Sequence, residues 1–186
     1  GFLLCARGRF AEAERAFDHA IGLNPAYGTA WLGRGLTRVR QGRTEPGRDD
    51  VQVAVTLEPR RAVFRSYLAK TYQVVRQPGL ASRELRLARE LDPGDPTAWL
   101  YGALLAQAEN EVNTAVSDLE QSVALNDHRQ VYRSRLLLDQ DRAVRGANLA
   151  AVYRDAGLTD WAVQEAGRAV SADYANYSSH LFLANS

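Results

Sequence analysis

Residues 31–59 of the chain read WLGRGLTRVRQGRTEPGRDDVQVAVTLEP, and the sequence on either side repeats this stretch at a fixed spacing. Its closing tripeptide, Leu57-Glu58-Pro59, recurs as Leu23-Asn24-Pro25, Leu91-Asp92-Pro93 and Leu125-Asn126-Asp127. Successive copies lie 34 residues apart. A period between about 20 and 50 residues is typical of a solenoid, in which each repeat packs mainly on its neighbours. The sequence therefore predicts a repeat protein.

Within each period, apolar residues recur at the spacing of an amphipathic helix, and turn residues separate the helical stretches. Phe10, Ala13 and Phe17 form one such stripe, Gly42 marks a turn, and Pro78 suits a first helical position. The pattern predicts the tail of a helix over 1–7 and further helices over 10–23, 28–41, 45–57, 62–75, 78–91, 96–109 and 112–125. Short turns between antiparallel helices indicate an all-α fold.

The repeat resembles the tetratricopeptide (TPR) family, whose motif is W-x2-L-G-x2-Y, then A-x3-F, then a closing Pro. Matching residues are Trp31, Gly35, Ala54, Pro59, Leu68, Ala69, Tyr72, Ala81, Ala88, Pro93, Trp99, Ala103, Ala115, Leu149, Ala150, Tyr153 and Ala162. Arg34, Arg38, Gly47 and Val51 depart from the motif, and Arg65 replaces its Trp. The resemblance implies a right-handed α-solenoid of antiparallel helix pairs, the TPR superhelix, running as a single segment over residues 1–186.

The period divides the chain into repeats at about 1–27 (partial), 28–61, 62–95, 96–127, 143–176 and 177–186 (partial), with an insertion at 128–142. If Tyr174 takes the closing Pro position, it follows Asp127 by 47 residues, which is the 34-residue period plus 13. The basic residues of this region are Arg129, Arg133, Arg135, Arg142 and Arg145. They could bind carboxylates or phosphates. Alternatively, Leu136 to Leu138 cover a groove while the arginines reach water.

In the family that the chain resembles, the first helix of each pair lines a concave groove. The corresponding residues are Leu32, Leu36, Val39, Ser66, Lys70, Gln73, Leu100, Leu104 and Gln107. An apolar to mixed groove of this kind could hold a partner helix. The alternative is that its leucines pack against adjacent repeats. These positions lack the Lys and Asn pattern with which some family members clamp a terminal carboxylate, so that function is disfavoured.

Catalysis, metal binding and cofactor binding find little support in the sequence. His19, His128 and His180 lie far apart, without the close spacing of ligands on one helix. The pairs Asp49-Asp50 and Asp139/Asp141 are expected at helix starts, where the helix dipole favours negative charge. We therefore expect no enzyme activity, no metal and no cofactor.

The expected partner is another protein or a peptide, bound by an interaction scaffold. A formal charge of +1 gives no sign of bulk attraction to nucleic acid, and no apolar run is long enough for a membrane span. The alternative is a structural subunit that binds neighbouring copies of itself end to end, because 1–7 and 177–184 would present uncapped apolar faces. The chain contains no Met and begins inside a repeat, so we expect it to be a segment of a longer protein.

Residues 132–157 and 176–184 also resemble a subgroup found in large bacterial cell-envelope proteins. That resemblance implies a periplasmic, outer-membrane-associated or extracellular location rather than an activity.

Overall fold

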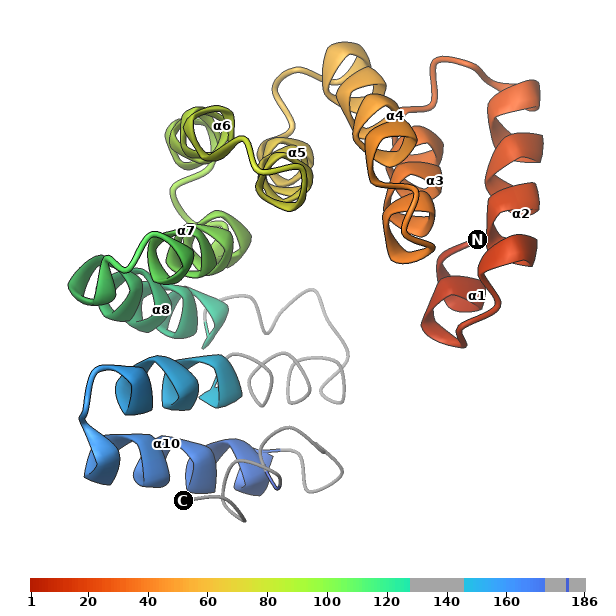
Figure 1. Cartoon of the computed structure of the whole chain (residues 1–186). Helices are drawn as coiled ribbons and strands as arrows, with labels where there is room; N and C mark the ends of the chain where they lie inside the picture. Colours follow the sequence, from red (N-terminus) through yellow and green to blue (C-terminus); the bar gives the residue numbers. More distant parts are fainter. Residues whose placement is uncertain (128–145, 173–179, 181–186) are drawn as a thin grey trace. The chain divides into compact units, whose positions relative to one another are not determined.

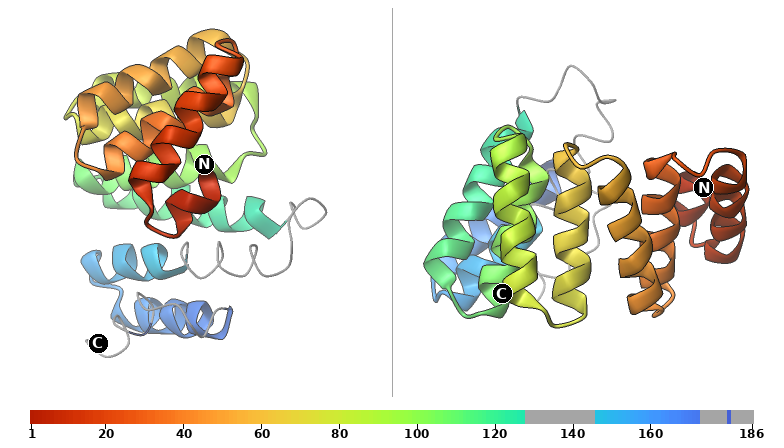
Figure 2. Two further views of the ribbon diagram at one scale, coloured as in Figure 1. Left: turned by 90° about the vertical axis from the view of Figure 1, so that its right-hand side faces the viewer. Right: turned by 90° about the horizontal axis from the view of Figure 1, so that it is seen from above.

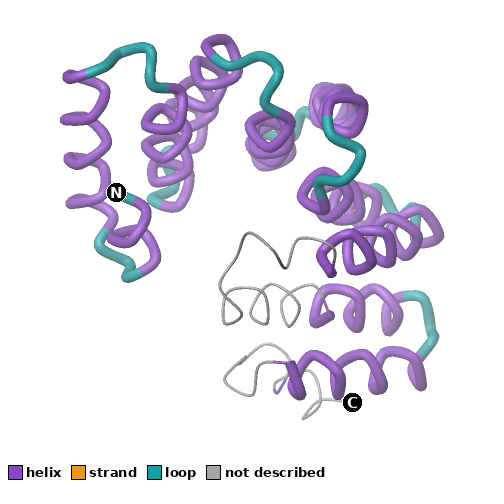
Figure 3. The backbone as a smooth tube through the Cα atoms, turned by 180° about the vertical axis from the view of Figure 1, so that it is seen from behind, coloured by secondary structure: helices purple, strands orange, loops and turns teal. Residues whose placement is uncertain are grey.

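The computed structural model describes residues 1–127, 146–172 and 180. Within these residues the regular structure is helical and there is no strand, as Figures 1 and 3 show. The all-α fold class is therefore confirmed. The chain divides into two compact units, Gly1–Pro93 and Gly94–Ser186, and each is described by itself. That the repeats form one continuous solenoid stays a prediction.

The first unit contains three helix pairs, shown from two further directions in Figure 2. The bounds are α1 (Phe2–Ala6) with α2 (Phe10–Leu23), α3 (Gly28–Arg40) with α4 (Thr44–Leu57), and α5 (Ala62–Val74) with α6 (Pro78–Leu91). The second unit contains α7 (Pro96–Ala108), α8 (Val112–Asp127), a helix over 146–155 and α10 (Thr159–Ala172). The predicted bounds agree with these to within one or two residues. Helices α2, α4 and α6 each end two residues before a proline, which disfavours helix in the residue that precedes it.

A residue with left-handed backbone ends the first helix of each pair. These residues are Gly8 (φ 73°), Gly42 (φ 81°), Arg76 (φ 58°), Asn110 (φ 62°) and Gly157 (φ 78°). The amide of the next residue reaches back five positions, as when Arg43 N–H donates to the Arg38 carbonyl at 2.9 Å. This hydrogen bond satisfies a carbonyl that the helix end would leave unpaired. The first four turns lie 34 residues apart and the last follows after 47, which is the spacing of the closing tripeptides and the predicted insertion.

Helices α3 and α4 cross at two glycines. A Cβ atom on Gly35 would lie 2.6 Å from the carbonyl oxygen of Gly47, and one on Gly47 would lie 2.7 Å from that of Gly35. The two backbones are therefore in direct contact, which only glycine allows. Around this crossing the first unit buries a core of Leu32, Val51, Ala54, Val55, Phe64 and Leu68. Small residues at the crossing and large ones beside it give this core the close packing of a protein interior.

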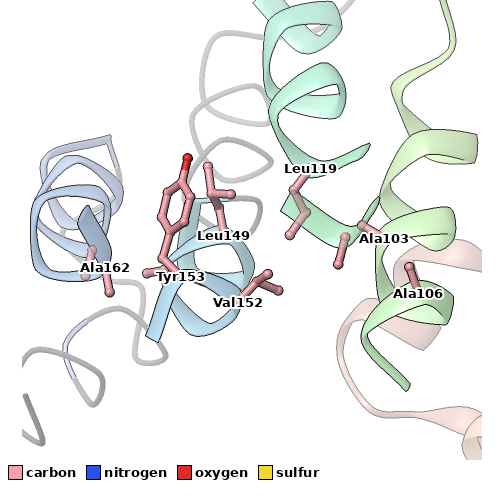
Figure 4. Close-up of a cluster of buried hydrophobic side chains, with 10 residues drawn as sticks. Ala103, Ala106, Leu119, Leu149, Val152, Tyr153 and Ala162 are labelled. Carbon is pink, nitrogen blue, oxygen red and sulfur yellow. The ribbon is translucent and has the colours of Figure 1, made fainter. Parts of the chain in front are cut away.

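The core of the second unit joins four helices, as Figure 4 shows. Ala103 and Ala106 come from α7, Leu119 from α8, and Ala162 from α10. The helix over 146–155 contributes Leu149, Val152 and Tyr153 to the same cluster. The Tyr153 hydroxyl donates to Glu120 at 2.7 Å, and burial followed by this hydrogen bond raises the pKa of the phenol. The helix after the predicted insertion thus packs on α7 and α8 like an ordinary repeat.

Candidate functional site

The first helices of the second and third pairs, α3 and α5, bring together most of the predicted groove residues of the first unit. Residues 34 apart hold equivalent places on neighbouring first helices, so Lys70 corresponds to Leu36 and Gln73 to Val39. Leu36 and Tyr67 pack against one core cluster, which shows that α3 and α5 lie side by side here. We call this surface the α3–α5 face. It comprises Leu36, Val39 and Arg40 on α3, with Lys70, Gln73 and Val74 on α5.

Two residues predicted for the groove do not line it. Leu32 is 5% exposed and packs in the core with Phe64 and Leu68. Ser66 is fully buried, and its hydroxyl donates to the Ala62 carbonyl one helical turn earlier. Both predictions were wrong because these positions turn toward the neighbouring helices rather than toward solvent.

The remaining predicted residues of this unit are only partly buried. Leu36 and Val39 on α3, and Lys70 and Gln73 on α5, keep part of their surface in contact with water. Val74, which the sequence did not single out, is 46% exposed at the end of α5. Apolar surface is therefore available on the α3–α5 face, and its role as a binding groove remains a proposal.

In the second unit, Leu100, Leu104 and Gln107 lie along α7 and are also partly exposed. Leu100 packs against the core of this unit, which favours a partly structural role for it. The Gln107 side-chain amide donates to Asp155 at 2.9 Å and so joins α7 to the helix over 146–155. Of the three, Leu104 best retains the character of a groove residue.

Acidic residues are absent from the first helices of the first unit. Helices α1, α3 and α5 contain no aspartate or glutamate, whereas α2, α4 and α6 all contain some. The α3–α5 face carries the cations Arg40 and Lys70 instead. Burial lowers the pKa of Lys70, and the nearby positive charge of Arg40 lowers it further.

Two arginines that depart from the family motif join three helices. Arg34 donates from Nε and Nη2 to both carboxylate oxygens of Asp50, at 2.9 and 2.7 Å, and from Nη1 to Asp18 at 2.8 Å. Arg38 donates to Glu14 at 2.9 Å and to Asp50 at 2.8 Å. Charges on α2, α3 and α4 therefore neutralise one another in a position that the motif fills with apolar side chains.

The expectation that Asp50 lies at a helix start was wrong. Asp50 lies in the middle of α4 and is buried, because both arginines of α3 reach it there. The guanidinium of Arg34 also stacks 4.6 Å above the Trp31 ring. Its hydrogen bonds to Asp50 are the main reason that the pKa of Arg34 is raised. The sequence signal was two arginines in apolar motif positions, followed by an acid on the next helix.

Other predicted site residues contribute no site in the structure. The insert residues Arg129, Arg133, Arg135, Arg142 and Arg145 lie outside the described residues, and so does His128. His19 is exposed on α2. The described ranges hold no group of three or more His, Cys, Asp or Glu side chains arranged to bind a metal ion. None of their helices combines the length and the hydropathy needed to span a membrane.

No protein-family model matches the chain, and no curated protein shows significant sequence similarity to it. Solved structures do match. TTC0263, a thermophilic TPR protein of Thermus thermophilus, has a TM-score of 0.85 and 21% identity over 100% of this chain and 94% of its own. A chain of the APC/C hetero-tetramer Cut9-Hcn1 has a TM-score of 0.82 and 19% identity over 98% of this chain, which spans 34% of that one.

YrrB, described as a TPR protein with an unusual peptide-binding site, has a TM-score of 0.59 and 18% identity over 96% of this chain and 86% of its own. At these identities the likeness concerns the fold. It agrees with the 34-residue period, the helix pairs and the left-handed turn that ends each first helix. By its fold, the chain is a tetratricopeptide-repeat protein.

Proposed function

We propose that the chain is a protein–protein interaction scaffold that binds a partner protein or peptide through its first helices, without catalysis of its own. The observation that carries this proposal is the α3–α5 face, where the half-exposed Leu36 and Val39 lie beside Arg40 and Lys70 on acid-free helices. Apolar side chains ringed by charge are typical of surfaces that bind an amphipathic helix. Leu104 on α7 extends the proposal to the second unit. YrrB offers a precedent for peptide binding on this fold.

The test is to immobilise the chain, identify a captured protein, purify it, and measure its binding to the chain directly. Leu36→Glu and Leu104→Glu, made separately, should each weaken that binding and leave the helical circular dichroism unchanged. Leu80→Glu is the matched control, since Leu80 is 42% exposed on the second helix α6. Wild-type binding by both groove variants would overturn the proposal, and unfolding of either would show that its leucine is core.

The alternative function is end-to-end assembly. It is supported by α1, where Phe2 is 49% and Leu3 is 79% exposed. Large apolar side chains exposed on a terminal repeat favour stacking on another repeat. Light scattering should then show oligomers that grow with concentration and that Leu3→Glu dissociates, whereas a monomer at high concentration rules this function out. The other predicted assembly surface, 177–184, lies almost wholly outside the described residues.

A cell-envelope location is part of the proposal as well. It rests on the resemblance of 132–157 and 176–184, which lie in large part outside the described residues. Fractionation of the source organism with an antibody against the chain would test it, and recovery in the cytosolic fraction would contradict it.

A further inference from the structure

The charges of α3 and α5 are neutralised unevenly. Arg34 and Arg38 pair with carboxylates of α2 and α4, and Arg65 pairs with Glu84 of α6 at 2.7 Å. These pairs lie where the first helices pack against the second helices. Arg40 is different, because in the described part of the chain no ion pair joins it to a carboxylate and its side chain is exposed. The α3–α5 face therefore holds positive charge that its own helices do not balance.

Arg40 and Lys70 face each other across the two helices. Arg40 follows Leu36 by one helical turn, and Lys70 holds on α5 the place that Leu36 holds on α3. The two cations consequently lie diagonally on neighbouring first helices. Their closeness is felt electrostatically, since the charge of Arg40 adds to burial in lowering the pKa of Lys70. An anion placed between them would remove this repulsion and gain two favourable interactions.

The surroundings of the two cations are apolar. Leu36 and Val39 flank Arg40 on α3, and Val74, which is 46% exposed, follows Lys70 by one turn on α5. A complementary ligand needs apolar side chains on one stripe and an acidic side chain at its edge. An amphipathic helix with a glutamate or aspartate beside its apolar stripe has this pattern.

We propose that the α3–α5 face binds an acidic amphipathic helix of a partner protein, with a carboxylate between Arg40 and Lys70 and apolar side chains on Leu36, Val39 and Val74. This inference rests on the proposed function and names the chemistry of its partner. Nucleic acid fits less well, because its affinity comes from many phosphate contacts, whereas this face offers two cations among apolar side chains and the chain carries a net charge of +1.

The test uses a labelled helical peptide of about 15 residues, long enough to form a helix when bound. It carries leucines at i, i+3, i+4 and i+7 and glutamates beside them, and two matched peptides carry glutamine or lysine in place of glutamate. Fluorescence anisotropy with the whole chain should show about tenfold tighter binding of the glutamate peptide than of the glutamine peptide, a difference of about 1.4 kcal/mol.

Arg40→Glu and Lys70→Glu should each abolish this preference, and the double variant should favour the lysine peptide. The control is Arg86→Glu, which makes the same charge change at an exposed position of α6 and should leave the preference intact. Equal affinity for the three peptides, or binding of none, overturns the inference. Tighter binding of a single-stranded oligonucleotide, lost in Arg40→Glu, would overturn it in favour of nucleic acid. The proposed function fails separately, if a captured partner ignores Leu36→Glu and Leu104→Glu.

Discussion

Arg65 donates from Nε to the Pro59 carbonyl at 3.0 Å, and this bond repeats, 34 residues later, the one that the Trp31 indole donates to the Pro25 carbonyl at 2.8 Å. In both repeats the donor ties a first helix to the turn that precedes it. The carbonyl lies just after the end of a second helix, where backbone acceptors lack helical partners. An arginine can therefore replace the motif tryptophan because each carries an N–H group that reaches this carbonyl.

Arg65→Leu should destabilise the first unit by about 1–3 kcal/mol. The variant loses the hydrogen bond to Pro59 and removes the cation that faces the largely buried Glu84. Urea unfolding followed by circular dichroism measures the change, and Arg86→Leu on the exposed side of α6 is the control. Arg65→Trp combined with Glu84→Leu should recover most of the loss. An Arg65→Leu variant as stable as the wild type would mean that neither contact matters.

The fold was predictable from the sequence because its period sets the places of the small residues, the closing prolines and the turns. The arginine contacts were not, since a family motif states which residue is usual at a position and says nothing about how an unusual one is neutralised. Arg34 and Arg38 register only as departures until α2 and α4 supply Glu14, Asp18 and Asp50. Arg40 was missed for the same reason in reverse, because only the structure shows that it lacks such a carboxylate.

Groove residues were predictable only in part. The family pattern placed Leu32 and Leu36 on the same surface, yet Leu32 is buried against Phe64 and Leu36 is half-exposed. Two leucines one turn apart on a helix differ in burial because the neighbouring helix covers one and ends short of covering the other. Such differences depend on how helices cross, which the hydrophobic pattern does not contain.

Gly47→Ala should destabilise the chain by about 1–2 kcal/mol, although alanine favours helix over glycine. The new Cβ would lie 2.7 Å from the Gly35 carbonyl oxygen and 2.6 Å from a Val39 methyl, so α3 and α4 would have to separate. The opposite sign is expected for Gly79→Ala on α6, where nothing lies within 4 Å of the new atom. Fluorescence of Trp31, the first unit's tryptophan, reports both in a Trp99→Phe, Trp161→Phe background. Equal signs would show that the crossing can relax.

Arg76→Gly should stabilise the chain by about 0.5–1 kcal/mol. Arg76 has a φ of 58°, a conformation that costs a side chain with a Cβ atom roughly 1–2 kcal/mol, part of which the extra freedom of glycine in the unfolded chain offsets. The reciprocal variant, Gly42→Ala, places a Cβ at a φ of 81° in the equivalent turn and should destabilise by about 1 kcal/mol. Thermal unfolding of both measures the effect. A lower melting temperature for Arg76→Gly would contradict the prediction.

The stability of the first unit should fall in acid partly through Glu14. Its hydrogen bond to Arg43 is the main cause, with a further bond to Arg38, of a pKa held below the ordinary value of 4.5 despite partial burial. A lowered folded pKa means that the carboxylate stabilises the fold fully above 4.5 and loses this contribution as the pH falls through the folded pKa. Glu14→Gln lacks the titrating group. The stability difference between wild type and Glu14→Gln should therefore be constant near neutral pH and shrink below it.

Urea unfolding midpoints measured between about pH 3 and 7 give this difference directly, since the range spans the titration of a paired carboxylate. Glu90→Gln, at an exposed position of α6, controls for the loss of one negative charge. If the wild type exceeds Glu14→Gln by the same margin at every pH, the carboxylate of Glu14 does not act through its charge. The contacts to Arg38 and Arg43 would then be neutral hydrogen bonds in effect, and the salt dependence of the wild type should be equally flat.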